Sequence, residues 1–258
     1  PAVQGQPSGL DLAPHHGVAH EAFELQHHGA LLGAAQRVGT GLYRQQGLVD
    51  QFQPRGESHG LGRCAFVSDS DGATVAVSGD PQVITTAYGK AVRFDGDGDR
   101  LLVDANPLEG AQEFTVEIFF NPADAYPNNW EPRFFHIEAE DNPNRRITIE
   151  LRLNDKKQWY LDAYIKSETS QFTLIDPTKV HPIGQWAHAA VTYQNGEFVS
   201  YVNGVRELTG QVEYLPIAAH AKTSIGARMN KVHWFNGDIA WVKITPAVLP
   251  PEAFTLAK

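Results

Sequence analysis

The chain has 258 residues, of which 42% are hydrophobic, and this is enough apolar material for a packed core. Its formal net charge of −9 at pH 7 argues against nucleic acid as a partner, because nucleic-acid affinity depends on Lys and Arg meeting phosphates. The single cysteine, Cys64, excludes an internal disulfide and a zinc site made of cysteines. No run of about 18 apolar residues occurs, so we expect no membrane insertion.

Residues 1–64 differ in composition from the rest of the chain. They contain no Lys, Asn, Ile or Trp, but they hold six of the eleven histidines. Some apolar residues have helical spacing, yet glycines interrupt them, and each glycine costs a helix about 1 kcal/mol relative to alanine. We therefore predict an irregular or partly helical N-terminal extension over residues 1–64.

From residue 65 to residue 258 the sequence predicts one all-β domain. Short alternating segments such as "FTVEIFFNP", "RITIELRL" and "WAHAAVTYQ" are separated by Gly, Pro, Asn and Asp. Asn195-Gly196 lies between two of these segments and predicts a tight hairpin. About thirteen such segments without intervening helices favour a two-sheet antiparallel jelly-roll sandwich.

Several blocks of this region resemble a known superfamily. "GKAVRFDGDGDRLLV", "FTVEIFFNP", "GQWAHAAVTYQNGEFVSYVNG", "TSIGARM" and "WFNGDIAWVKI" follow one another in the order seen in laminin G-like, concanavalin A-like lectin/glucanase jelly rolls. The resemblance covers residues 75 to 256 and implies a concanavalin A-like fold. It leaves function open, because this superfamily includes lectins, adhesion modules, glycosidases and polysaccharide lyases.

The loop "FDGDGD" is a candidate metal site. It places Asp95, Asp97 and Asp99 at alternate positions, and calcium prefers six to eight oxygen ligands. The resemblance implies a structural calcium that combines an early acidic loop with an aspartate near the last strand, here Asp238. We predict calcium at Asp95, Asp97 and Asp238, and a solvated turn is the alternative.

Polar residues recur on one side of several predicted strands. Period-two alternation places Arg146, Glu150 and Arg152 on one face and Tyr160, Asp162 and Tyr164 on another. In "RFFHIEAE" the same rule pairs His136 with Phe134 and separates both from Arg133 and Phe135. His188 in "WAHAAVTY" and Arg228 in "TSIGARM" are further candidates. We predict that these side chains line one concave face.

The residue types on this face indicate specific roles. Arg offers planar donors for carboxylate or sulfate, aromatic rings stack on sugars, and His exchanges protons near neutral pH. If the face is catalytic, the candidates are Glu150, His136, His188, Arg152 and Asp162. The candidates for ligand binding are Arg133, Arg146, Tyr160, Tyr164, Arg228 and Trp130.

Three functions fit these patterns. The first is a carbohydrate-recognising domain, whose partner is a carbohydrate or another small acidic ligand. The second is an enzyme on the same face, either a polysaccharide lyase or a hydrolase, and the third is a structural or adhesion module whose sheet is merely solvated. We expect a secreted or periplasmic protein although no signal is visible, with a cytoplasmic location as the alternative. The sequence does not specify the oligomeric state.

Overall fold

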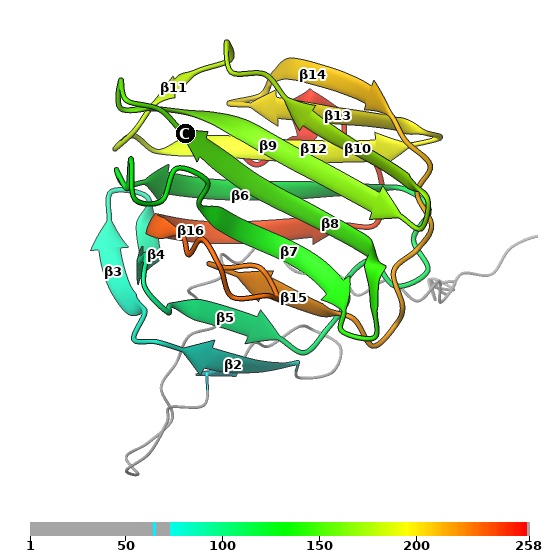
Figure 1. The fold of residues 1–258 in the computed structure, drawn as a ribbon, viewed down its shortest axis with the longest axis horizontal. Helices are drawn as coiled ribbons and strands as arrows, with labels where there is room; N and C mark the ends of the chain where they lie inside the picture. Colours follow the sequence, from blue (N-terminus) through cyan, green and yellow to red (C-terminus); the bar gives the residue numbers. More distant parts are fainter. Residues whose placement is uncertain (1–63, 66–72, 257–258) are drawn as a thin grey trace, which may run out of the picture. The chain divides into compact units, whose positions relative to one another are not determined.

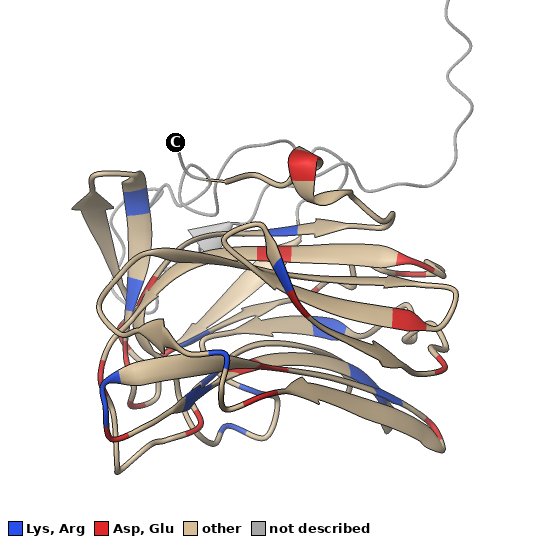
Figure 2. Cartoon of the chain, turned by 90° about the horizontal axis from the view of Figure 1, so that it is seen from above, with Lys and Arg blue, Asp and Glu red and all other residues tan. Residues whose placement is uncertain are grey.

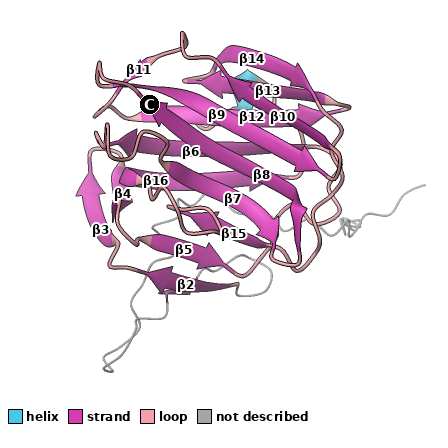
Figure 3. Cartoon of the chain, viewed as in Figure 1, coloured by secondary structure: helices cyan, strands magenta, loops and turns pink. Residues whose placement is uncertain are grey.

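The computed structural model describes residues 64–65 and 73–256, which form strands, loops and one short 3-10 helix, η1 (Pro251–Ala253) (Figure 3). In this part of the chain, no helix is long and apolar enough to cross a membrane. The predicted extension over residues 1–63 lies outside the described residues. The boundary at residues 64 and 65 therefore stays a prediction.

Nine strands form the first sheet, and all its strand pairs are antiparallel (Figure 1). In spatial order they are β1 (Cys64–Ala65), β2 (Thr74–Ser78), β5 (Arg100–Val103), β15 (Lys222–Ile225), β7 (Arg133–Ala139), β8 (Asn142–Leu153), β9 (Gln158–Ser167) and β10 (Ser170–Ile175), with β11 (His181–Pro182) also paired to β9.

Seven strands form the second sheet, again by antiparallel pairing. Their order is β14 (Val205–Gln211), β13 (Glu197–Val202), β12 (Ala187–Gln194), β6 (Phe114–Pro122), β16 (Asn236–Thr245), β4 (Gly89–Asp95) and β3 (Gln82–Thr86). The two sheets lie one above the other (Figure 2). The all-β jelly-roll prediction is thus confirmed.

The Asn195-Gly196 hairpin joins β12 to β13 as predicted. Both residues have positive φ angles, 50° for Asn195 and 90° for Gly196. Positive φ at both central positions is the mark of a type I′ turn, whose twist matches that of the flanking strands.

The core lies between the sheets and is filled by alternate side chains of each strand. On β8 these are Ile147, Ile149 and Leu151, all at most 1% exposed. Phe120 of β6 meets them from the second sheet, with its ring centroid 5.2 Å from that of Trp159 on β9. Because this alternation buries one face of β8 and β9, the other face of these strands points outward.

A β-bulge in β7 changes this alternation at Phe134. Arg133 pairs with Glu150 and Phe135 pairs with Ile149, so Phe134 has no partner on β8. Phe134 and Phe135 are both fully buried in the core. A bulge places two consecutive residues opposite one, and it therefore turns Arg133 to the same outer face as His136.

Gly226 ends β15 and directs the chain toward Arg228. Its φ is +88°, and a Cβ there would lie 2.4 Å from Cε1 of Phe94 and 3.0 Å from the carbonyl oxygen of Asp99. Its N–H donates to the Phe134 carbonyl at 3.0 Å, and its carbonyl accepts from the Phe235 N–H at 2.8 Å. This position therefore needs glycine for both its φ angle and its close contacts.

We expect Gly226→Ala to destabilise the fold strongly. The left-handed backbone costs an L-residue about 1–2 kcal/mol, and overpacking adds about 1–3 kcal/mol. Gly110→Ala is the matched control, because its φ is +69° but no atom lies within 4 Å of the added Cβ. Urea unfolding should show a clearly larger loss for Gly226→Ala, and equal losses would contradict the packing argument.

Candidate binding site on the first sheet

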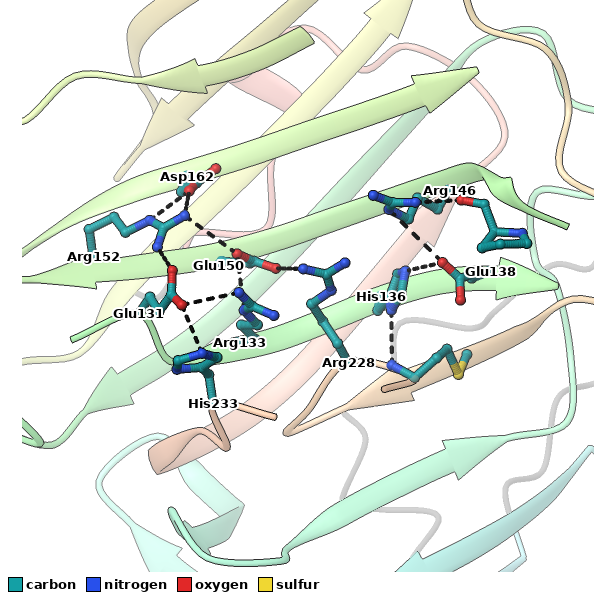
Figure 4. A network of polar contacts seen from close by, with 12 residues as sticks. Glu131, Arg133, His136, Glu138, Arg146, Glu150, Arg152, Asp162, Arg228 and His233 are labelled. Atoms are coloured by element: carbon teal, nitrogen blue, oxygen red, sulfur yellow. Dashed lines mark hydrogen bonds and ion pairs between the residues drawn. The ribbon is translucent and has the colours of Figure 1, made fainter. Parts of the chain in front are cut away.

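The outer face of β7, β8 and β9 carries a row of directly opposed polar residues (Figure 4). Across β7 and β8, Arg133 pairs with Glu150, and Glu138 pairs with Arg146. Across β8 and β9, Glu150 pairs with Asp162. Opposed side chains on one face of a sheet lie about 5 Å apart at Cβ. Opposite charges therefore face each other across β7 and β8, whereas two carboxyl groups, Glu150 and Asp162, face each other across β8 and β9.

The bulge at Phe134 corrects one prediction made from alternation alone. Strict alternation pairs His136 with Phe134 and separates His136 from Arg133, and this is wrong. Arg133 and His136 share the outer face, while both phenylalanines enter the core. Arg133 thereby joins the predicted ligand-binding residues on the face.

Arg152 is the centre of one end of the network. Its Nε donates to Oδ2 of Asp162 at 2.7 Å, and its Nη1 donates to Oε2 of Glu131. Its guanidinium carbon lies 5.1 Å from the ring centroid of Trp130, within cation–π range. His233 Nε2 lies 2.8 Å from the other Glu131 oxygen. Glu131 and Trp130 thus fix the direction of Arg152.

Glu150 occupies the middle of the face without a hydrogen bond to any of its neighbours. Its carboxylate lies 3.5 Å from Arg133 Nε, 3.5 Å from Arg228 Nη1 and 3.9 Å from Arg152 Nη2. Oε1 of Glu150 and Nε of both Arg133 and Arg228 are buried and without a hydrogen-bond partner. Such groups are costly unless water or a guest supplies the missing bond.

His136, Glu138 and Arg146 form the other end of the network. His136 Nδ1 accepts from the N–H of Met229 at 3.0 Å, which places the proton of the neutral ring on Nε2. Nε2 lies 3.3 Å from Oε2 of Glu138, which also lies 3.9 Å from Nε of Arg146. The guanidinium of Arg146 lies over the Tyr164 ring at 5.2 Å.

A depression of about 300 Å³ opens on this face. Its lining consists of Arg133, Arg146, Thr148, Glu150, Arg152, Asp162, Tyr164, Thr173, Ile175 and Arg228. The lining holds four arginines and two carboxyl groups, and Glu131 and Glu138 beside it bring the whole network close to charge balance. Tyr160 lies on the same face opposite Arg152 but is not in the lining.

His188 does not belong to this face, and the prediction that it does is wrong. It lies on β12 in the second sheet, where its Nε2 is 3.2 Å from Oε1 of Glu117. Phe254 covers it with a ring centroid distance of 5.7 Å, and it is 1% exposed. Alternation along a strand indicates the face of that strand but not the sheet to which it belongs.

Sequence reasoning missed one acidic member of the network, Glu131. Alternation did place Glu138 on the strand face of His136, and the structure agrees. Glu131 lies in the loop before β7, where no periodicity applies. Its position depends on Arg152 and His233, which are distant in sequence.

The residues predicted to bind calcium have other polar partners in the structure. Both carboxylate oxygens of Asp238 accept from Arg93, at 2.8 and 3.2 Å. Asp95 Oδ1 accepts from the N–H of Asp97 at 2.7 Å. Among residues 64–65 and 73–256, no group of three or more metal-ligating side chains lies together. Calcium binding by Asp95, Asp97 and Asp238 stays a prediction.

A comparison with protein families shows to which family this chain belongs. Residues 94–253, more than half of the sequence, match the concanavalin A-like lectin/glucanases superfamily of laminin G type. The chain belongs to this family. The resemblance inferred from the sequence blocks is therefore confirmed, and a search of curated proteins found no match.

Solved structures share the fold of this chain at low sequence identity. Domain 4 of AbnA, an extracellular arabinanase from Geobacillus stearothermophilus in complex with arabinotriose, is 20% identical, with a TM-score of 0.53 over 70% of this chain and 85% of that one. The binding domain of botulinum neurotoxin DC in complex with SialylT is 19% identical, with a TM-score of 0.51 over 70% and 45%. The receptor-binding domain of botulinum neurotoxin mosaic serotype C/D is 15% identical, with a TM-score of 0.54 over 70% and 44%.

Two carboxyl groups of the network have pKa values shifted in opposite directions. Burial raises the pKa of Glu150 above its ordinary 4.5, even though Arg133 and Arg228 oppose the shift. Burial acts in the same sense on Glu131, but the hydrogen bond and charge of Arg152, together with Arg133 and His233, outweigh it and lower the pKa. The folded environment thus shifts Glu150 toward protonation and Glu131 toward ionisation.

We expect Glu150→Gln and Glu131→Gln to change stability in opposite directions at pH 7. A raised pKa means that Glu150 contributes stability below pH 4.5 that is lost as the pH rises through its folded-state pKa. Glutamine mimics the protonated acid, so Glu150→Gln should be at least as stable as the parent at pH 7, with the difference vanishing in acid. Glu131→Gln should be less stable at pH 7. A carboxyl group whose pKa is lowered in the folded state stabilises the fold at pH values above its unfolded-state pKa, and this contribution disappears as the pH falls.

Unfolding midpoints in urea, measured across this pH range for the parent and both variants, test the pair. The same sign of change for both variants at pH 7 would contradict the assignment.

Proposed function

We propose that the outer face of the first sheet binds a carbohydrate that carries a carboxylate or sulfate group. The observation that carries the proposal is the depression lined by four arginines and two carboxylates, with unpartnered polar atoms of Glu150, Arg133 and Arg228 at its centre. A guanidinium offers paired donors to an acidic group. Glu150 Oε1 offers an acceptor to a sugar hydroxyl.

Aromatic rings border the same surface. Trp130 is 48% exposed, and Arg152 lies over its ring without covering it completely. Tyr164 lines the depression itself, with its hydroxyl donating to Gln171 Oε1 at 2.7 Å. Aromatic faces beside planar polar groups suit a ring that has one apolar side and a rim of hydroxyls.

The related structures support a carbohydrate guest. The AbnA domain is in complex with arabinotriose, and the neurotoxin DC binding domain is in complex with SialylT. The AbnA enzyme is extracellular, which agrees with our expectation that this protein is secreted or periplasmic. These proteins share the fold alone, so the acidic character of the guest rests on the arginines of this chain.

Recognition fits the depression better than catalysis does. A lyase needs a proton acceptor at its substrate, but His136 is buried and does not line the depression, and the hydroxyl of Tyr164 is held by Gln171. A hydrolase needs two carboxyls with distinct roles, and burial raises the pKa of both Glu150 and Asp162. Hydrolysis by this adjacent pair is the second candidate function, since these two carboxyls stand directly opposite each other on β8 and β9.

Calorimetric titration with oligouronates, sulfated oligosaccharides and their neutral counterparts tests the proposal. We expect only the acidic oligosaccharides to bind, and we expect added salt to weaken their binding. Arg228→Gln should weaken binding about 10-fold to 100-fold, the value of a charge-assisted hydrogen bond. Arg206→Gln is the matched control, because Arg206 is an exposed arginine of β14 in the second sheet.

Equal affinity for acidic and neutral sugars at this face would refute the acidic guest. If none of these sugars binds, the structural module whose sheet is merely solvated is the function that remains. Product formation that Glu150→Gln abolishes while binding persists would identify the hydrolase instead.

A further inference from the structure

A second polar hollow lies on the outer face of the second sheet, at the end of β4, β16 and β6. It measures about 240 Å³, and its lining includes Arg93, Asn121, Pro122, Gly184, Gly237 and Asp238. In the register of the sheet Asp238 pairs with Arg93 on one side and with Asn121 on the other. These three residues therefore form one row across β4, β16 and β6, which lie side by side in Figure 1.

The neighbouring residues of β4, β6 and β16 show that this row points outward. Phe94, Phe120 and Ile239 belong to the core between the sheets. Arg93, Asn121 and Asp238 each adjoin one of these residues along its strand, so alternation places them on the opposite side. The row is thus separated from the polar face of the first sheet by the whole core.

The charges in this row are balanced, and one polar atom has no hydrogen-bond partner. The guanidinium of Arg93 holds both oxygens of Asp238, so the pair is neutral as a unit. Each carboxylate oxygen still has a lone pair for another donor. Oδ1 of Asn121 is buried and has no hydrogen-bond partner. The hollow therefore offers acceptors beside the exposed guanidinium of Arg93 without a net charge.

An aromatic cluster lies next to the row on the same face of the second sheet, outside the lining of the hollow itself. It consists of Tyr88, Phe119, Trp186 and Trp241. Phe119 lies two residues before Asn121 on the same face of β6, and Trp186 stacks on Phe119 with a centroid distance of 5.0 Å. Tyr88 is 49% exposed. A Cβ at Gly184 would meet no atom within 4 Å, so the hollow is open there, whereas a Cβ at Gly237 would lie 2.4 Å from the Asn121 carbonyl oxygen.

From this juxtaposition we propose that the second sheet binds a neutral sugar residue through Asn121, Asp238 and Arg93, beside Tyr88 and Trp186. Hydroxyls donate to Asp238 and Asn121 and accept from Arg93, while the apolar side of the ring contacts the aromatic cluster. The volume of this hollow is below the range of about 300–1,000 Å³ that is typical of pockets for larger ligands. A single sugar ring therefore fits better than a chain of sugars. The protein then has two saccharide sites on opposite faces, with different charge preferences.

The tryptophans allow the two faces to be observed separately. Among the five tryptophans, Trp130 borders the first site, Trp186 and Trp241 border the second, and Trp159 is fully buried in the core. We propose titrating the full chain with glucose, galactose, mannose, xylose and arabinose while recording the indole N–H signals by NMR. At least one of these sugars should shift Trp186 and Trp241 and leave Trp130 and Trp159 unchanged.

Two variants test the row, and a third is the control. Asn121→Leu and Arg93→Gln should each weaken this binding about fivefold or more, the effect of losing a polar contact. Arg93 is largely exposed, so its variant should fold even if Asn121→Leu does not. Arg228→Gln should leave neutral-sugar binding unchanged, and Asn121→Leu should leave acidic-sugar binding unchanged.

The proposal is overturned if none of the five sugars shifts Trp186 or Trp241, or if Arg93→Gln binds like the parent. Loss of acidic-sugar binding alone would count against the first face and not against this one.

Discussion

The packing of Phe134 into the core is the contact on which the polar face depends. Its ring centroid lies 4.9 Å from Phe120 and 5.4 Å from Phe235, so it fills space between the two sheets. The bulge that turns Phe134 inward also turns Arg133 outward to meet Glu150. Without the bulge, Arg133 would enter an apolar core, where an unpaired charge is very costly. Core packing therefore determines which charges meet on the surface.

The charges on that face are close to balance, and this explains how four arginines lie together on one sheet. Arg152 is held by Asp162 and Glu131, and Arg146 lies near Glu138. Glu150 differs from these carboxylates, because it lies at 3.5 Å or more from its arginines and is mostly buried. A group that is within reach of several cations but bonded to none can change partners at little cost. The centre of the face is thus better suited to receive a guest than its two ends.

Much of the fold and part of the site follow from local sequence patterns. Alternation along β8 and β9 correctly places Arg146, Glu150 and Asp162 on one outer face, because a single-residue slip would expose the core. Alternation fails at Phe134, since a bulge depends on tertiary packing. It also cannot assign His188 to a sheet, because strand order in a jelly roll is set by crossovers between distant segments. The ion pair of Asp238 could not be foreseen for a related reason, since its partner Arg93 is 145 residues away.

The two sheets treat their buried charges differently, and this difference separates a site from a structural cluster. On the second sheet Glu117 accepts from the N–H of Thr255 at 2.6 Å and lies 3.4 Å from Lys243 Nζ, while Phe254 covers His188. The segment that follows β16 thus closes over this cluster and excludes a guest. On the first sheet the charged row opens into a depression instead. Buried charges that are covered by their own chain support the fold, whereas those that remain accessible with unpartnered atoms retain the capacity to bind.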